Sequence, residues 1–270
     1  MTWFRSLCIA FSMYSRLPVP YGNWDRKEMR YSIGLFPMVG VVIGAMSWIW
    51  MLGMQRIMSG GSVKLPEATL LAVSTLIAAI HPVLVTGGIH VDGFMDTCDA
   101  RGSWADKDKK LQILSDPHIG AFSVISLLIL SAFWIAAVAV VVGSGDGRYF
   151  GVFAFEYVLA RALSGLAAVL FRNARGEGTL WAFTDFGEEA KRTNLVLLCA
   201  AGLAAAAGMI LLKPAAGCAA VIVSGFVWVS YKRSAYKEFG GITGDLEGWF
   251  LCKCEVLAAC AMAVVCICGL

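Results

Sequence analysis

Apolar runs of about 20 residues recur along this chain, separated by short polar connections. A helix of that length crosses a hydrocarbon core of about 30 Å, and a backbone in lipid must satisfy its hydrogen bonds within helices or a closed barrel. Hydrophobic residues make up 59% of the 270 residues and charged residues only 15%, which excludes an ordinary soluble domain. The sequence therefore predicts an all-α polytopic integral membrane protein.

We expect about seven membrane-spanning helices in one membrane-embedded domain covering residues 1–270. Their approximate ranges are 31–54, 68–89, 119–143, 149–171, 194–212, 215–231 and 249–269. The connection KPAAG, with Pro214 and Gly217, predicts a tight antiparallel hairpin. The N-terminal apolar stretch is too short to span and is interrupted by Arg16, so it is expected to form either an interfacial or a re-entrant helix.

The polar connections fall into two sets when the spans alternate across the membrane. The first set contains residues 1–30, 92–118, 172–193 and 232–248, and the second contains 55–67, 144–148, 213–217 and the C-terminal tip. The first set holds sixteen of the 22 Lys and Arg residues, so the positive-inside rule makes it cytoplasmic. It also holds fifteen of the 19 Asp and Glu residues, which favours an active site at the cytoplasmic face over a transport path through the bundle.

The segment HVDGFMDTCDARGSW carries three aspartates, Asp92, Asp96 and Asp99, at i, i+4 and i+7. If the segment is helical, the carboxylates project from one face, where a divalent cation would relieve their repulsion. Oxygen ligands favour Mg²⁺ or Mn²⁺, and Mg²⁺ usually takes further oxygens from a phosphate. Gly93 would allow close approach of a backbone or ligand. The alternative is a solvated acidic loop.

A glycine-rich turn precedes the last span in EFGGITGDLEGWF. Free N–H groups at a helix N-terminus suit a phosphate, so Thr243 and Gly244 are candidate substrate contacts and Asp245 a candidate metal ligand. Thr243 and Asp245 could equally cap the helix.

Other charged residues could complete such a site. Arg175 is a candidate phosphate clamp, and Arg161, within a span, is expected to face the bundle interior with Glu156 as its partner. Asp116 and His118 flank Pro117 after a short amphipathic helix that starts near residue 106. Asp116 is a candidate metal ligand, and His118 has either a phosphate-contact or proton-transfer role or a structural role at the interface.

Several other site classes lack support in the sequence. No Ser/His/Asp set, Walker A loop or GxGxxG motif precedes a helix, and the nine cysteines form no CxxC pair. Basic residues at membrane edges give no support for nucleic-acid binding.

Five segments together resemble the cobalamin synthase family, the adenosylcobinamide-GDP ribazoletransferases. They are SRLPVP at 15–20, FPMVGVVIG at 36–44, GGIHVDGFMDTCDARG at 87–102, SDPHIGAF at 115–122 and GGITGDLEG at 240–248. Two positions depart from the usual pattern of the family: Ala100 stands where glycine is common, and His118 stands where arginine is common.

The resemblance implies an enzyme of the bacterial cytoplasmic (inner) membrane that transfers phosphocobinamide from adenosylcobinamide-GDP to α-ribazole or its 5′-phosphate and releases GMP. It implies Mg²⁺ as cofactor, with Mn²⁺ as a substitute. This reaction agrees with the site expected from the residues, in which the metal ligands are Asp92, Asp96, Asp99, Asp116 and Asp245 and the substrate contacts are Gly93, His118, Arg161, Arg175, Thr243 and Gly244. The proton acceptor is Asp99 or Asp245.

Two rival functions share some of these sequence features. A CDP-alcohol phosphotransferase also uses spaced aspartates and Mg²⁺, but it needs Ala-Arg soon after Asp-Gly, and Phe-Met-Asp follows Asp92-Gly93 here. A cation or corrinoid transporter fits the one-sided charge distribution poorly. The lipid bilayer is an expected partner. The sequence leaves open homo-oligomer formation, contacts with other corrinoid-pathway enzymes, the number of metal ions and the choice between ribazole and its phosphate.

Overall fold

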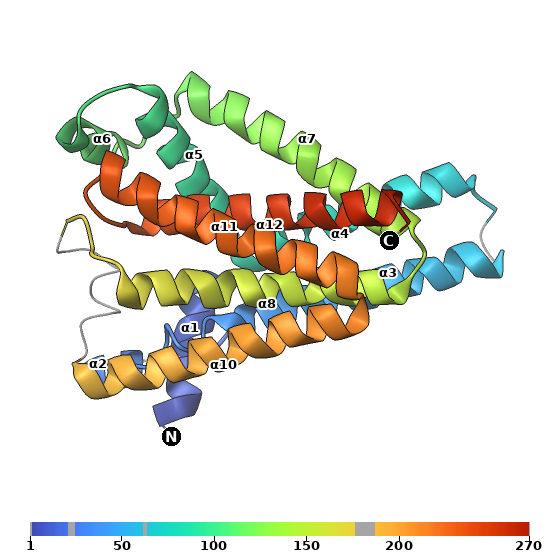
Figure 1. The fold of residues 1–270 in the computed structure, drawn as a ribbon, viewed down its shortest axis with the longest axis horizontal. Helices are drawn as coiled ribbons and strands as arrows, with labels where there is room; N and C mark the ends of the chain where they lie inside the picture. Colours follow the sequence, from blue (N-terminus) through green and yellow to red (C-terminus); the bar gives the residue numbers. More distant parts are fainter. Residues whose placement is uncertain (1, 21–24, 62–63, 176–186, 270) are drawn as a thin grey trace.

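Seven long helices lie along one another as a bundle in the computed structural model, which describes residues 2–20, 25–61, 64–175 and 187–269 (Figure 1). They are α3 (Pro37–Gly60), α4 (Glu67–Thr86), α7 (Ala121–Gly143), α8 (Gly147–Leu170), α10 (Glu188–Leu212), α11 (Pro214–Glu238) and α12 (Gly244–Ile267). Each is long and apolar enough to cross a membrane, which confirms the prediction of seven spans in an all-α membrane protein. In the described ranges the only β pairing is an isolated bridge between Asn173 and Ile242.

Four shorter helices complete the described chain: α1 (Thr2–Tyr14), α2 (Arg26–Met29), α5 (Ile89–Gly102) and α6 (Lys107–Ile113). Gly87 and Gly88 separate α4 from α5, with φ angles of 67° and 85° that favour glycine. The second span therefore ends at Thr86, three residues before its expected end. The aspartate segment that follows is a separate helix.

Span boundaries differ from expectation at the polar ends. The first span begins at Pro37 instead of near residue 31. Three later spans extend beyond their apolar runs. α10 begins at Glu188, α11 ends at Glu238 and α12 begins at Gly244. Hydrophobicity marks the part of a helix that lies in lipid, but the hydrogen-bonded helix continues into the polar region.

The N-terminal helix α1 lies across the long axis of the bundle (Figure 1). Its 13 residues are too few to span. Ile9 and Ala10 are buried, while Trp3 and Phe4 are exposed, as expected for a helix resting at an interface. The chain after it is tied to α4, because the Arg16 N–H donates to the Val85 carbonyl at 2.8 Å.

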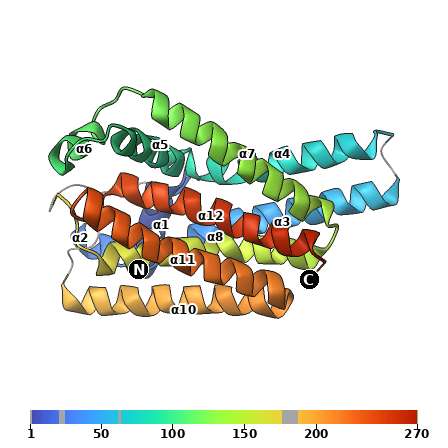
Figure 2. The same cartoon turned by 45° about the horizontal axis from the view of Figure 1, so that its top comes forward.

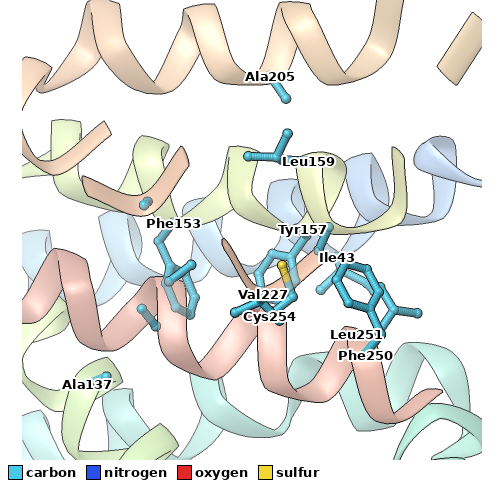
Figure 3. Packing of buried hydrophobic residues seen from close by; sticks show 14 of the residues in the cluster. Ile43, Ala137, Phe153, Tyr157, Leu159, Ala205, Val227, Phe250, Leu251 and Cys254 are labelled. Carbon is cyan, nitrogen blue, oxygen red and sulfur yellow. The ribbon is translucent and has the colours of Figure 1, made fainter. Parts of the chain in front are cut away.

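The central helix α8 has buried side chains all round its circumference. Gly40 and Gly44 of α3 lie directly against its backbone at Tyr157 and Ala154, where a Cβ atom would not fit. Small residues of this kind let membrane helices approach closely. Figure 3 shows Tyr157 among side chains from α3, α11 and α12. This packing is the core that holds the bundle together.

The hairpin between α10 and α11 confirms the sequence prediction. α10 ends at Leu212 and α11 starts at Pro214, so Lys213 alone joins them. The two helices run side by side in both views (Figures 1 and 2). Gly217 packs against the Met209 backbone, where a side chain would collide.

The two ends of the bundle differ in character. The α3–α4, α7–α8 and α10–α11 connections and the C-terminus lie at one end. At the other end lie α2, α5, α6, the end of α11 and the start of α12 (Figures 1 and 2). The described residues of the first connection set therefore gather at one end, as the alternation of spans predicted.

Candidate active site

A close crossing of α5 and α12 creates the site. A Cβ atom on Gly93 would lie 2.8 Å from both Cα and the carbonyl oxygen of Asp245, and one on Gly248 would lie 2.8 Å from the His90 oxygen. These distances are too short for any side chain, so glycine at both positions permits the crossing. The crossing sets the aspartates of α5 beside the first turn of α12.

Three aspartates lie near this crossing. Asp92 and Asp96 lie four residues apart on α5, as the spacing predicted, and Asp245 comes from the first turn of α12. Burial and the nearby charges of Asp92, Asp245 and Asp99 raise the pKa of Asp96 to about 6. The site therefore concentrates like charge that a cation would relieve.

Asp99 has a definite structural contact. Its Oδ2 accepts the Gly120 N–H at 2.7 Å and its Oδ1 accepts the Ser123 N–H at 2.9 Å. These are free amides of the first turn of α7, so Asp99 caps that helix from α5. Ala100 is buried inside α5 and has no positive φ, so Asp99 is presented by a helix and glycine is not required at 100.

The donor set suits Mg²⁺ bound jointly with a substrate. Among the described residues, no group of three or more His, Cys, Asp or Glu side chains is close enough to hold a metal ion. Mg²⁺ commonly takes one or two protein carboxylates and completes its shell with water and substrate phosphate. Asp96 with Asp92 or Asp245 meets that requirement.

A cavity of about 380 Å³ lies beside these carboxylates, enclosed by α1, the residues before α3, α5, α8 and α12. Its apolar lining includes Met13, Tyr14, Ile33, Phe36 and Leu251, and its polar lining is His90, Asp92, Ser164, Gly244, Asp245 and Glu247. Burial and the Arg161 charge lower the pKa of His90 to about 3, so this imidazole is neutral. The cavity is the natural place for a substrate next to the aspartates.

Asp116 and His118 lie together on an exposed loop between α6 and α7. The His118 Nδ1 and Asp116 Oδ1 are 2.6 Å apart, and the side chains are 88% and 53% exposed. Hydrogen bonds from His118 lower the pKa of Asp116. Neither residue lines the cavity. Metal binding by Asp116 and phosphate contact by His118 therefore stay predictions. The Asp116 carboxylate is already paired with the His118 ring.

Arg161 lies in the bundle interior, as predicted, but its predicted partner is wrong. Its Nη1 forms an ion pair with Glu255 of α12 at 2.7 Å, and the side chain is fully buried. Glu156 instead accepts the Ser224 hydroxyl at 3.1 Å. Arg161 and Glu255 thus join α8 to α12.

Arg175 and Thr243 have local contacts at the polar end. The Arg175 Nη2 donates to the Leu111 oxygen at 2.6 Å and to the Ser115 hydroxyl at 2.9 Å. These bonds attach Arg175 to α6 and to the segment that directly follows α6. Thr243 caps α12, since its hydroxyl oxygen accepts the Leu246 N–H at 3.3 Å. Gly244 lines the cavity.

Two polar features were missed by sequence reasoning. Glu247 is buried at the cavity, where it accepts the hydroxyl of Ser164 at 2.6 Å and that of Tyr231 at 3.0 Å. Its only sequence signal is an acidic residue two positions after Asp245. The second feature is a cluster of ion pairs between residues that are more than 100 positions apart in the sequence, so no local pattern shows it.

That second feature is an ion-pair cluster around Glu238. Arg101 donates to both oxygens of Glu238, at 3.1 and 2.9 Å, and the Lys110 Nζ lies 3.1 Å from the same carboxylate. Arg101 also stacks over the Trp249 ring at 4.8 Å. The cluster fastens α5 and α6 to α11 and so supports the helix that carries the aspartates.

The bundle of apolar helices with an acidic cavity at one end defines a polytopic membrane protein. The sequence matches the family described as cobalamin-5-phosphate synthase over residues 6–263, and the chain belongs to this family.

Curated relatives agree over nearly the whole chain. A protein of Lachnoclostridium phytofermentans is 36% identical over 264 residues, covering 98% of this chain and 95% of the relative. One from Clostridium botulinum strain Alaska E43 is 30% identical over 254 residues, covering 94% and 95%. One from Geobacillus kaustophilus is 28% identical over 245 residues, covering 89% and 88%. Each is named adenosylcobinamide-GDP ribazoletransferase. No solved structure matches this chain.

Proposed function

We propose that this chain transfers the phosphocobinamide unit of adenosylcobinamide-GDP to α-ribazole or its 5′-phosphate. The products are adenosylcobalamin, or its 5′-phosphate, and GMP, in the step of cobalamin biosynthesis that assembles the nucleotide loop. Family membership supports the reaction. The structural observation that carries it is that Asp92 of α5 and Asp245 of α12 both line a cavity, with Asp96 four residues further along α5.

Asp96 with either Asp92 or Asp245 would hold Mg²⁺, or Mn²⁺ in its place, and the substrate phosphates and water would complete the shell. When bound, the ion would neutralise part of the negative charge of the pyrophosphate. The chain's own residues position the reactants, because α5 and α12 hold the carboxylates at a fixed crossing.

The transfer is a displacement at phosphorus. A ribose hydroxyl oxygen of the acceptor forms the new bond to the phosphorus on the cobinamide side. The P–O bond to GMP breaks, and GMP leaves with the electron pair. The hydroxyl proton passes to a carboxylate, for which Asp245 is the better candidate, since both oxygens of Asp99 already accept backbone N–H groups of α7.

The site faces the cytoplasm in this proposal. The connections that are rich in Lys and Arg lie at the end of the bundle that carries α5, α6 and the start of α12, and the positive-inside rule makes that end cytoplasmic. The seven spans place the protein in a membrane, and we assign it to the bacterial cytoplasmic membrane, where a cytoplasmic nucleotide donor reaches the site directly.

The test is an assay of purified protein in liposomes with adenosylcobinamide-GDP and α-ribazole, with either Mg²⁺ or a chelator. GMP release that requires both substrates and stops with chelator is the expected result. Absence of GMP release with Mg²⁺ would overturn the activity, and release that is insensitive to chelator would overturn the metal requirement.

A further inference from the structure

The cavity beside the aspartates has two chemically different walls. Tyr14 of α1 and Phe36 lie on the apolar wall, with ring centroids 4.2 Å apart and planes inclined by 38°. Met13, Ile33 and Leu251 extend this wall. A flat aromatic group would lose its water there and gain ring contacts.

The volume limits what can enter. At about 380 Å³ the cavity lies near the lower end of the range of about 300–1,000 Å³ that is usual for small-molecule sites. A corrin macrocycle with its amide side chains is too large for it, while a two-ring aromatic base on a ribose is of suitable size. The donor therefore has to approach from outside, with only its pyrophosphate near the aspartates.

The polar part of the lining includes Glu247, which is 7% exposed. Its Oε2 accepts the Ser164 hydroxyl and its Oε1 accepts the Tyr231 hydroxyl, so its orientation is held on both sides. Glu247 forms no ion pair with any described residue. Burial of a carboxyl group without a charged partner costs free energy, and such groups inside a membrane bundle are typically functional. Each oxygen keeps a second lone pair, which can accept a ligand hydroxyl.

His90 adds a second polar group to this lining. Its Nε2 is enclosed and has no hydrogen-bond partner in the described chain, although the residue lines the cavity. An enclosed ring nitrogen without a partner is uncommon, because burial of a polar atom without a hydrogen bond costs free energy. This nitrogen exposes no surface to the cavity, so a ligand hydroxyl would reach it only if the ring shifted.

The charge of the lining also selects the ligand. The polar wall contains the carboxyl groups of Asp92, Asp245 and Glu247, and no Lys or Arg of the described chain lines the cavity. The part of a ligand that enters is therefore uncharged and rich in hydroxyl donors, which describes a base with its ribose.

We infer that this cavity binds the nucleoside part of the acceptor, with the aromatic base against Tyr14 and Phe36 and the ribose hydroxyls on Glu247. This inference rests on the proposed function. Glu247 is the residue that selects a hydroxyl-bearing nucleoside, and Ser164 and Tyr231 are positioning residues that orient it. α1 supplies the wall against which the base packs.

Glu247→Gln replaces one of the two hydroxyl-accepting oxygens by an amide donor while keeping the size of the side chain. In the GMP-release assay it should raise the KM for α-ribazole at least tenfold and leave the KM for adenosylcobinamide-GDP within twofold. Glu156→Gln is the matched control, because Glu156 is equally buried, accepts one serine hydroxyl and does not line the cavity. Its acceptor KM should stay at the wild-type value.

Ala168→Leu tests the cavity without touching a polar group, since Ala168 lines it and the larger side chain fills it. Calorimetric titration of α-ribazole into the Mg²⁺-loaded protein, without donor, should show binding weakened at least tenfold. This variant decides the question if Glu247→Gln fails to fold. Wild-type acceptor binding and KM in the folded variants, with normal GMP release, would overturn the cavity assignment and leave the proposed function intact. Failure of the wild type to release GMP would overturn the proposed function instead.

Discussion

The Asp99 carboxylate accepts the backbone N–H of Gly120 at 2.7 Å, so a side chain of α5 caps α7, 21 residues later in the chain. Asp99→Ala should lower the free energy of unfolding by about 0.5–2 kcal/mol, the usual range for loss of a helix cap. Thermal unfolding in detergent measures the loss. Asp106→Ala is the control, since Asp106 caps only the seven-residue, exposed α6. Equal destabilisation by both variants would contradict a special role for the Asp99 contact.

Gly93→Ala should reduce activity by separating α5 from α12. A methyl group there would lie 2.8 Å from the Asp245 backbone, so the helices must move apart and the aspartates with them. A displacement of this kind at a reacting site costs about 10²-fold in rate. GMP release with saturating substrates measures the effect.

Gly225→Ala is the matched control for this substitution. Gly225 lies inside α11, and a Cβ atom there would have nothing within 4 Å. Alanine should leave activity unchanged and should stabilise the helix by up to about 1 kcal/mol. Gly93→Ala protein with wild-type turnover would show that the close crossing is not needed for catalysis.

The architecture was largely predictable because each part of it has a local cause. Twenty-residue apolar runs require spans, and the i, i+4, i+7 spacing of Asp92, Asp96 and Asp99 puts them on one helix face. The roles of individual residues were less predictable. Asp99 caps a helix whose position depends on tertiary packing.

The sequence also could not predict which charged residues pair across the bundle. Arg161 pairs with Glu255, 94 residues away, although Glu156 is nearer in sequence. Hydrophobic patterning does not report which helices are neighbours, so it could not choose between the two glutamates. Glu247 was missed for the same reason, because its importance depends on Ser164 and Tyr231 from two other helices.

Asp96→Asn should nearly abolish turnover while the protein remains folded and inserted. The substitution keeps the shape of the side chain but removes a carboxylate that interacts with the charges of Asp92 and Asp245. Asp108→Asn removes the same charge from the exposed face of α6, away from the cavity, and should leave turnover at the wild-type rate. Asp96→Asn activity within about tenfold of wild type would reject the metal-ligand role.

Metal binding should depend on pH through Asp96. Its pKa is raised by burial and by Asp92 and Asp99 on α5 and Asp245 on α12, so without a cation the folded state takes up a proton as the pH falls through about 6. For a raised acid pKa, ionisation destabilises the fold as the pH rises from about 4 to 6, and the cost is fully present above 6. A bound cation offsets that cost only where Asp96 is ionised.

The expected result is a larger rise of Tm with Mg²⁺ at pH 7.5 than at pH 5, measured in detergent without substrate. Asp96→Asn should remove the difference between the two pH values. An equal Mg²⁺ effect at both pH values in the wild type would place the cation elsewhere.

Arg161 and Glu255 should behave as a coupled pair. Arg161→Met leaves the Glu255 carboxylate buried beside an apolar side chain, and breaking a buried pair in this way costs about 3–5 kcal/mol. Glu255→Met leaves the guanidinium uncompensated at a similar cost. The double variant Arg161→Met/Glu255→Met buries no unpaired charge, so its loss of unfolding free energy should be well below the sum of the two single losses. Reversible unfolding in mixed micelles measures this cycle, and additive losses would mean that the 2.7 Å contact between the two side chains does not couple α8 to α12.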